Sequence, residues 1–150
     1  MDAIDRKILS ALQAEPGISV VDLAQKVGLS HTPCWRRIKK LEADGVIVGR
    51  AILLDPAAFG LGVVVFANLR LRHHDEDTLE SLENEARALP QITDCSSMSG
   101  DCDYILRIVV GSIDEYEAFL KKVLLHLPGV ASINSHFALK CIKRTTRLPI

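Results

Sequence analysis

Apolar side chains recur every three or four positions in three stretches of the first 45 residues, which is the spacing of an amphipathic helix. Each stretch is followed by a glycine or a proline, the residues that most often end helices. Small polar residues suited to capping precede the second and third stretches. The pattern predicts helices over about residues 2–14, 19–27 and 30–44, ended by Pro16, Gly28 and Gly45.

The segment after the third predicted helix changes to a β pattern. Residues 46–56 read VIVGRAILLDP, with two short apolar runs around Gly49 and Arg50, and such a sequence predicts a small hairpin. Three helices and a hairpin make a winged helix-turn-helix, which we expect over residues 1–54. Residues 55–62 read DPAAFGLG, and their proline and glycines predict a linker between two domains.

From residue 63 onward, strand-like runs alternate with helical stretches. Their order is βαββαβ, which is the split ferredoxin-like pattern and predicts an α+β second domain over residues 63–150. The last predicted helix is expected to turn Ile113, Tyr116, Leu120, Val123, Leu124 and Leu127 inward. The expected strands are 63–72, 92–99, 102–110 and 130–141, and the expected helices are 78–89, begun by Asp77, and one that begins at Ser112.

Both faces of the first predicted strand of this sheet begin apolar. One face covers the two helices, whereas the other leaves Val64 and Phe66, together with Ile105 and Val109 of the third strand, without a cover. Apolar patches of this kind usually mark interfaces, so we infer that the sheet dimerises. The alternative is that a few apolar residues on a free sheet face are unremarkable.

The third predicted helix has two contrasting faces within the stretch LSHTPCWRRIKKLEADG. Cys34, Ile38 and Leu41 form an apolar stripe, and bases with small polar residues occupy the opposite side. Such a side can be an ordinary solvated surface, but its place after a short helix and a tight turn is that of a recognition helix in a major groove. The predicted DNA-binding residues are Ser30, His31, Thr32, Trp35, Arg36, Arg37, Lys39, Lys40 and, in the wing, Arg50.

The charge distribution supports this interpretation although the net charge is only −1. Residues 1–50 hold eight Lys and Arg against six Asp and Glu, and residues 51–150 hold ten against thirteen. Five of the eight N-terminal bases lie between Arg36 and Arg50. A local basic strip creates the field that an anionic polymer feels, so its position matters more than the total charge.

Several other kinds of site and location are not supported by the sequence. There is no secretory pattern or long apolar span, which predicts a cytoplasmic protein without membrane contact. The four cysteines lack a C-x-x-C pair, and His73-His74 has no third ligand, so we expect no metal site and no cofactor. No nucleophile motif is present, which argues against an enzyme, although a small enzyme using Cys102 with a nearby histidine is an alternative.

Residues 98–104, MSGDCDY, join two predicted strands and carry candidate binding chemistry. Asp101 and Asp103 can accept hydrogen bonds from an ammonium group, while N–H groups near Gly100 can hold a carboxylate. The pair would suit a free amino acid. The alternative is an ordinary hairpin turn with solvated acids.

Four segments together resemble the Lrp/AsnC family, the leucine-responsive or feast/famine transcription regulators. They are IDRKILSALQ, LAQKVGLSHTPCWRRIKKLEADGVIVGRAILLDP, SGDCDYILRI and LPGVASINSHFALKCIKRTTRLPI, and the similarity runs over essentially the whole chain. The resemblance implies a DNA-binding helix-turn-helix at residues 20–39 and a C-terminal effector-binding and oligomerising RAM domain. It also implies dimers that assemble further into tetramers or octamers.

The resemblance also implies an amino-acid effector bound near the G-D-x-D loop, in a cleft between dimers. The residues that carry over are Ser99, Gly100, Asp101, Cys102 and Asp103. The family more often has an aromatic residue where Cys102 stands, which indicates a different side-chain preference. We therefore expect a regulator that binds double-stranded DNA and responds to a small amino acid; the alternative is an amino-acid-binding module without direct DNA binding.

Overall fold

The computed structural model describes residues 1–150, and the chain divides into two compact units. The first unit comprises residues 1–53 together with residues 143–150, which we call the tail. The second unit comprises residues 54–142. The tail, which the sequence pattern placed with the second domain, therefore groups with the first. None of the helices combines the length and apolar character that crossing a bilayer requires.

Three helices build the first unit, close to the predicted bounds: α1 (Ala3–Ala14), α2 (Val20–Val27) and α3 (His31–Ala43). Ser19 caps α2 by accepting a hydrogen bond from the N–H of Asp22. Gly28 ends α2 in the left-handed conformation, at φ 75°, which a residue without Cβ adopts readily. The helices enclose one apolar core in which Ile8, Leu23 and Cys34 are fully buried. The prediction of three helices is confirmed.

The predicted hairpin over residues 46–54 is wrong. Residues 48–55 carry no helix or strand, and only the N–H groups of Val46 and Ile47 return to the carbonyl of Leu41. The side chains of Val48 and Ile52 are almost fully exposed. Apolar β-formers favour an extended backbone, but two short strands alone bury too little surface to hold a hairpin. The first unit is thus a helix-turn-helix without a paired wing in this chain.

The tail is tied to the end of α1. The N–H of Leu148 donates to Oε1 of Gln13 at 2.6 Å, and the Gln13 amide donates back to the carbonyl of Leu148 at 3.3 Å. Nη2 of Arg147 donates to the carbonyl of Ala14, the last residue of α1, at 2.8 Å. Because α1 has no basic residue in its own last turn, Arg147 supplies the cation that a helix C-terminus favours.

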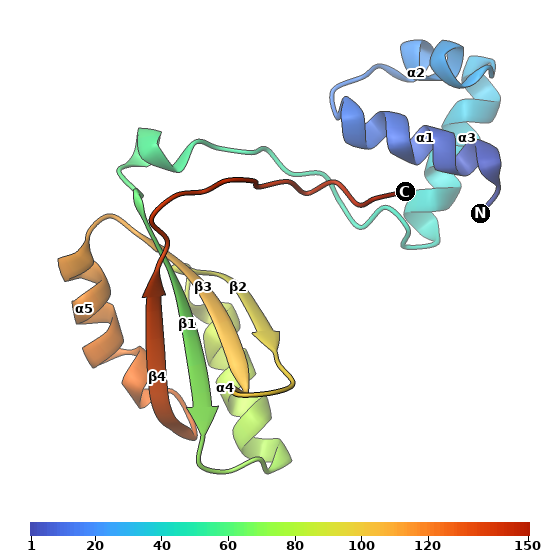
Figure 1. Ribbon diagram of the computed structural model, residues 1–150. Helices are drawn as coiled ribbons and strands as arrows, with labels where there is room; N and C mark the ends of the chain where they lie inside the picture. Colours follow the sequence, from blue (N-terminus) through green and yellow to red (C-terminus); the bar gives the residue numbers. More distant parts are fainter. The chain divides into compact units, whose positions relative to one another are not determined.

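The second unit is a four-stranded antiparallel sheet with two helices on one face (Figure 1). The strand order β2-β3-β1-β4 confirms the split ferredoxin-like prediction. Two single-turn 3₁₀ helices, η1 (Pro56–Phe59) and η2 (Leu124–His126), accompany it. The elements are β1 (Val63–Leu71), α4 (Glu76–Ala88), β2 (Ile92–Ser97), β3 (Tyr104–Val110), α5 (Ile113–Lys122) and β4 (Val130–Phe137).

Alternation along β1 and β3 separates a core face from an open face. Val65, Leu69 and Leu106 are fully buried beneath α4 and α5. On the open face Phe66 pairs with Arg107 in the register and retains 37% of its exposure. The two faces follow the predicted alternation, which leaves an apolar surface uncovered within one chain.

Several details of the second unit depart from the prediction, including β2, which ends at Ser97 instead of residue 99, and β3, which begins at Tyr104 instead of residue 102. Ile113, expected inward, is 63% exposed because it is the first residue of α5 and precedes the turn that packs on the sheet. Helix α4 begins earlier than predicted: Asp75 rather than Asp77 accepts from the N–H of Thr78. Strand β4 ends at Phe137 instead of extending to residue 141: its last registered pair is Phe137 with Val65, and beyond it the N–H of Ala138 donates to the carbonyl of Val64.

Candidate nucleic-acid interface and effector loop

Helix α3 is anchored by its apolar stripe as the sequence predicted. Cys34, Ile38 and Leu41 are buried against α1 and α2. Burial raises the pKa of the Cys34 thiol, so it stays protonated and packs as a small apolar group. The opposite side of the helix is therefore turned outward by packing that the other two helices provide.

The polar start of α3 is open to solvent. Ser30 occupies the N-cap position, but its hydroxyl makes no capping hydrogen bond, and His31 and Thr32 are exposed beside it. Trp35, a predicted DNA contact, is 46% exposed. Small polar side chains at the N-terminal end of a helix are the groups that reach base edges when such a helix enters a major groove.

The four cations of α3 differ in their partners. Arg36 and Lys40 are exposed and form no ion pair within the chain. Nζ of Lys39 lies 2.7 Å from Oε2 of Glu42, one turn along the same helix. Arg37 instead turns toward α1, where Nη1 lies 2.6 Å from Oδ2 of Asp2 and 2.7 Å from Oδ1 of Asp5.

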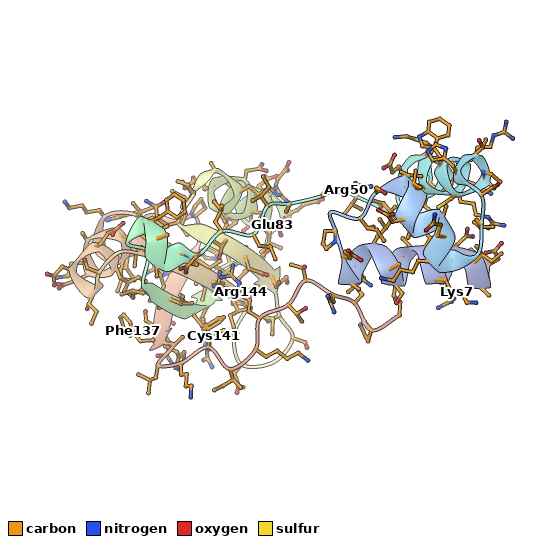
Figure 2. All side chains as sticks on the ribbon, turned by 90° about the horizontal axis from the view of Figure 1, so that it is seen from above. Lys7, Arg50, Glu83, Phe137, Cys141 and Arg144 are labelled. Atoms are coloured by element: carbon orange, nitrogen blue, oxygen red, sulfur yellow. The ribbon has the colours of Figure 1, made fainter.

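A shallow groove is bordered by three of these four cations. Its wall on α3 consists of Thr32, Pro33, Arg36, Arg37 and Lys40, and the start of α1 forms the other wall. Arg36 and Lys40, the two α3 cations without an ion-pair partner, therefore border the same groove as the paired Arg37. The remaining predicted contact, Arg50, lies on the stretch of chain that follows the helices (Figure 2).

The loop between β2 and β3 is closed by its backbone. The N–H of Met98 donates to the carbonyl of Asp103 at 2.9 Å, and the N–H of Asp103 donates to the carbonyl of Leu69 at 2.8 Å. Gly100 adopts φ 111°, a conformation that side chains disfavour. Ser99, Gly100 and Asp101 are exposed at the tip, and Cys102 is half-buried.

The two acids of this loop have different surroundings. Oδ2 of Asp103 accepts from the N–H of Leu71 at 2.7 Å, and its Oδ1 lies 2.9 Å from Nε2 of His74. The hydrogen bond from Leu71 and the contact with His74 hold the pKa of Asp103 below its usual value. Both oxygens of Asp103 are thus already engaged, whereas the Asp101 side chain is exposed and makes no hydrogen bond.

Arg70 and His74 are the loop partners that sequence reasoning missed. Nε of Arg70 donates to the carbonyl of Asp101 at 2.6 Å, so a residue of β1 holds the tip of the loop. Arg70 lies 31 residues before Asp101, and His74 lies 29 residues before Asp103. The sequence could not indicate these contacts, because the antiparallel pairing of β1 with β3 is what brings the residues together.

Comparison with known proteins accounts for both units. The profile of the Lrp/AsnC ligand-binding domain matches residues 64–148, and that of a winged helix-turn-helix DNA-binding domain matches residues 1–48. The chain belongs to the Lrp/AsnC family. Family membership agrees with the resemblance in the sequence and with the order of the two units.

Curated relatives of this Lrp/AsnC chain match along its whole length. It is 37% identical over 150 residues to the DNA-binding transcriptional activator DecR of Escherichia coli, covering 100% of this chain and 99% of that protein. It is 41% identical over 150 residues to the Bkd operon transcriptional regulator of Pseudomonas aeruginosa, covering 100% of this chain and 98% of that protein.

Solved structures agree with the fold in detail. An AsnC family transcriptional regulator from Agrobacterium tumefaciens matches with a TM-score of 0.94 and 45% identity, covering 99% of this chain and 97% of that chain. A transcriptional regulator from Neisseria meningitidis, solved as a complex with L-methionine, matches with a TM-score of 0.94 and 35% identity, covering 99% and 96%.

Proposed function

We propose that this member of the Lrp/AsnC family is a transcription regulator whose α3 binds the major groove of double-stranded DNA and whose second unit binds a small free amino acid. The observation that carries the DNA part is the position of Arg36 and Lys40. Both are exposed without an ion-pair partner, opposite the stripe that buries Cys34, Ile38 and Leu41. Unpaired cations on a convex helix are the groups that neutralise phosphates or reach guanine edges.

Dimerisation through the open face of the sheet completes the proposal. Phe66 and the half-buried Val64, Ile105 and Val109 leave an apolar surface there that a second copy would cover. A two-fold dimer presents two α3 helices, which predicts pseudo-palindromic sites with half-sites spaced by turns of the duplex. Further assembly into tetramers or octamers belongs to the same proposal, as does a cytoplasmic location.

The effector part rests on the loop of residues 98–103 and on the relative that was solved with L-methionine. Asp101 is the acid of the loop whose carboxylate is free to meet an ammonium group. The N–H groups near Gly100 suit a carboxylate. Cys102 is half-buried, and we expect it to influence which size of effector side chain the site accepts. Ser99 offers a further hydroxyl at the exposed tip.

The DNA part is tested by titrating the full-length protein with genomic fragments recovered by in vitro selection, at several salt concentrations. We expect Arg36→Ala to weaken binding by roughly 1 to 3 kcal/mol and Lys40→Ala to reduce the salt slope by about 1. Lys7→Ala, which removes an exposed base of α1, is the control with the same change of charge (Figure 2). Wild-type binding by both α3 variants would exclude this helix, and failure of the wild type to select any DNA would favour a module without DNA binding.

The effector part is tested by a thermal-shift screen with the twenty amino acids, followed by calorimetry on each that raises the melting temperature. Binding of an amino acid to the folded state alone must raise that temperature. We expect Asp101→Ala to abolish binding while leaving DNA affinity in the absence of effector unchanged. Unchanged calorimetric affinity of Asp101→Ala would place the amino acid elsewhere.

A further inference from the structure

Arg37 is part of a closed network at the start of α1. Nη1 of Arg37 contacts Oδ2 of Asp2 at 2.6 Å and Oδ1 of Asp5 at 2.7 Å. The other two oxygens cap the helix: the N–H of Asp5 donates to Oδ1 of Asp2 at 2.8 Å, and the N–H of Asp2 donates to Oδ2 of Asp5 at 2.9 Å. Each of the four carboxylate oxygens therefore has a donor within this network.

The network distinguishes Arg37 from its neighbours on α3. Its side chain retains 33% of its exposure and that of Asp5 only 15%, while Arg36 and Lys40 are exposed and unpaired. A guanidinium that donates to two carboxylates, one of them largely buried, exchanges them for a phosphate only at the cost of leaving both acids without their cation. A phosphate would therefore offer the Arg37 guanidinium no kind of acceptor that the two carboxylates do not already provide.

Resting on the DNA binding proposed above, we propose that Asp2 and Asp5 are specificity-determining residues, which withdraw Arg37 from DNA and use it to brace α3 against α1. Nonspecific affinity comes almost entirely from phosphate neutralisation, so one cation fewer lowers binding to every sequence. Specific affinity also needs base-edge contacts, which depend on the position of α3 and gain from the brace. Both effects raise the ratio of specific to nonspecific binding.

The location of the acids strengthens this argument. Asp2 and Asp5 border the same groove as Arg36 and Lys40, so their charges act on any phosphate that enters it. The network of Asp2, Asp5 and Arg37 carries a net side-chain charge of −1. At physiological salt the screening length is about 8 Å, so charges that border one groove are screened from each other less than charges on distant parts of the surface.

The test measures the salt slope of binding to a random-sequence 30-base-pair duplex, with the full-length protein. The double variant Asp2→Asn with Asp5→Asn keeps amide oxygens able to cap α1 but removes both charges. We expect its slope to steepen by about 0.9, the effect of one additional phosphate contact. We expect Arg36→Gln to reduce the slope by about 0.9 and Arg37→Gln to leave it at the wild-type value.

Two controls separate release of Arg37 from a change of charge. Asp44→Asn raises the net charge of the same unit without freeing a paired cation, because Asp44 is exposed and forms no ion pair. Its slope should remain that of the wild type. Adding Arg37→Gln to the Asp2→Asn, Asp5→Asn variant should return the slope to the wild-type value, since the released cation is then absent.

The ratio of specific to nonspecific affinity provides the second measurement. On a fragment selected with the wild-type protein, the Asp2→Asn, Asp5→Asn variant should lose discrimination against the random duplex by several-fold. A slope for Arg37→Gln as low as that of Arg36→Gln would show that Arg37 leaves the acids for a phosphate and would overturn the proposal. Wild-type protein that binds neither duplex would instead refute DNA binding itself, and circular dichroism of each variant excludes unfolding as the cause.

Discussion

His74 contacts Asp103 of the loop between β2 and β3: Nε2 of His74 lies 2.9 Å from Oδ1 of Asp103. His74 follows β1, and Asp103 immediately precedes β3, so the contact ties the loop of residues 98–103 to the end of the central strand. The other oxygen of Asp103 accepts from the N–H of Leu71. Asp103 is thus a residue that shapes the loop, beside the free carboxylate of Asp101.

Asp103→Ala is expected to lower the melting temperature of the protein more than Asp101→Ala does. The first substitution leaves the N–H of Leu71 without its partner, whereas the second keeps the backbone carbonyl that Arg70 contacts. Differential scanning calorimetry of both variants gives the comparison. Equal melting temperatures for the two variants would show that Asp103 does not hold the loop.

Tyr104 should make the second unit lose stability in alkali. Burial, with the hydroxyl donating to Oε1 of Glu83 at 2.7 Å, raises the pKa of Tyr104 to about 12 from its usual 10.0. Because the folded state holds this proton more tightly, the contribution is fully present below pH 10 and is lost as the pH rises toward about 12. Urea unfolding between pH 8 and pH 11 should show a smaller loss for Tyr104→Phe. Parallel pH profiles of variant and wild type would contradict this assignment.

Gly129→Ala is expected to destabilise the second unit by about 2 kcal/mol or more. Gly129 has φ 71°, and a Cβ at this position would meet the methyl group of Thr78 at the start of α4. Gly62→Ala is the matched control, since its Cβ would meet no atom within 4 Å and its φ is not positive. Denaturant unfolding measures both. A loss no larger than that of the control would mean that the start of α4 moves aside freely.

Gln13→Ala is expected to destabilise the first unit by about 1 kcal/mol, because it removes two exposed hydrogen bonds to Leu148. Gln25→Ala, at an exposed position of α2, controls for the change of side chain on a helix. Deleting residues 143–150 should have at least the effect of Gln13→Ala, since it also removes Arg147 from the end of α1. Amide hydrogen exchange in the last turn of α1 is the most direct measurement, and exchange unchanged by the deletion would count against the tail contact.

Helices and strands with clear periodicity were predictable from the sequence to within a few residues. Gly28 and Gly45 marked the ends of helices because both adopt positive φ, a conformation with a strong residue preference. The apolar stripe of Cys34, Ile38 and Leu41 was predictable because helical geometry alone decides which side chains share a face.

The sequence did not predict the structure correctly where it depends on contacts with other parts of the chain. The run around Gly49 and Arg50 has the composition of a hairpin, but strand formation requires a pairing surface, and residues 48–55 have none within the chain. Arg37 was predicted from the sequence as a DNA contact together with the other three cations of α3. Arg37 already has partners because α1 packs against α3, which brings Asp5, 32 residues earlier in the sequence, next to Arg37.

The contact of Arg147 with Ala14 has a consequence for biosynthesis. The final carbonyl of α1 emerges from the ribosome 133 residues before the guanidinium that stabilises it. During translation the helical unit is therefore synthesised before its last component, and a nascent chain carries α3 while the contact at the end of α1 is still missing. Arg147 is synthesised only after the sheet unit, through which we expect two copies to pair, is complete. The stabilised helical unit and the capacity to dimerise would therefore arise together.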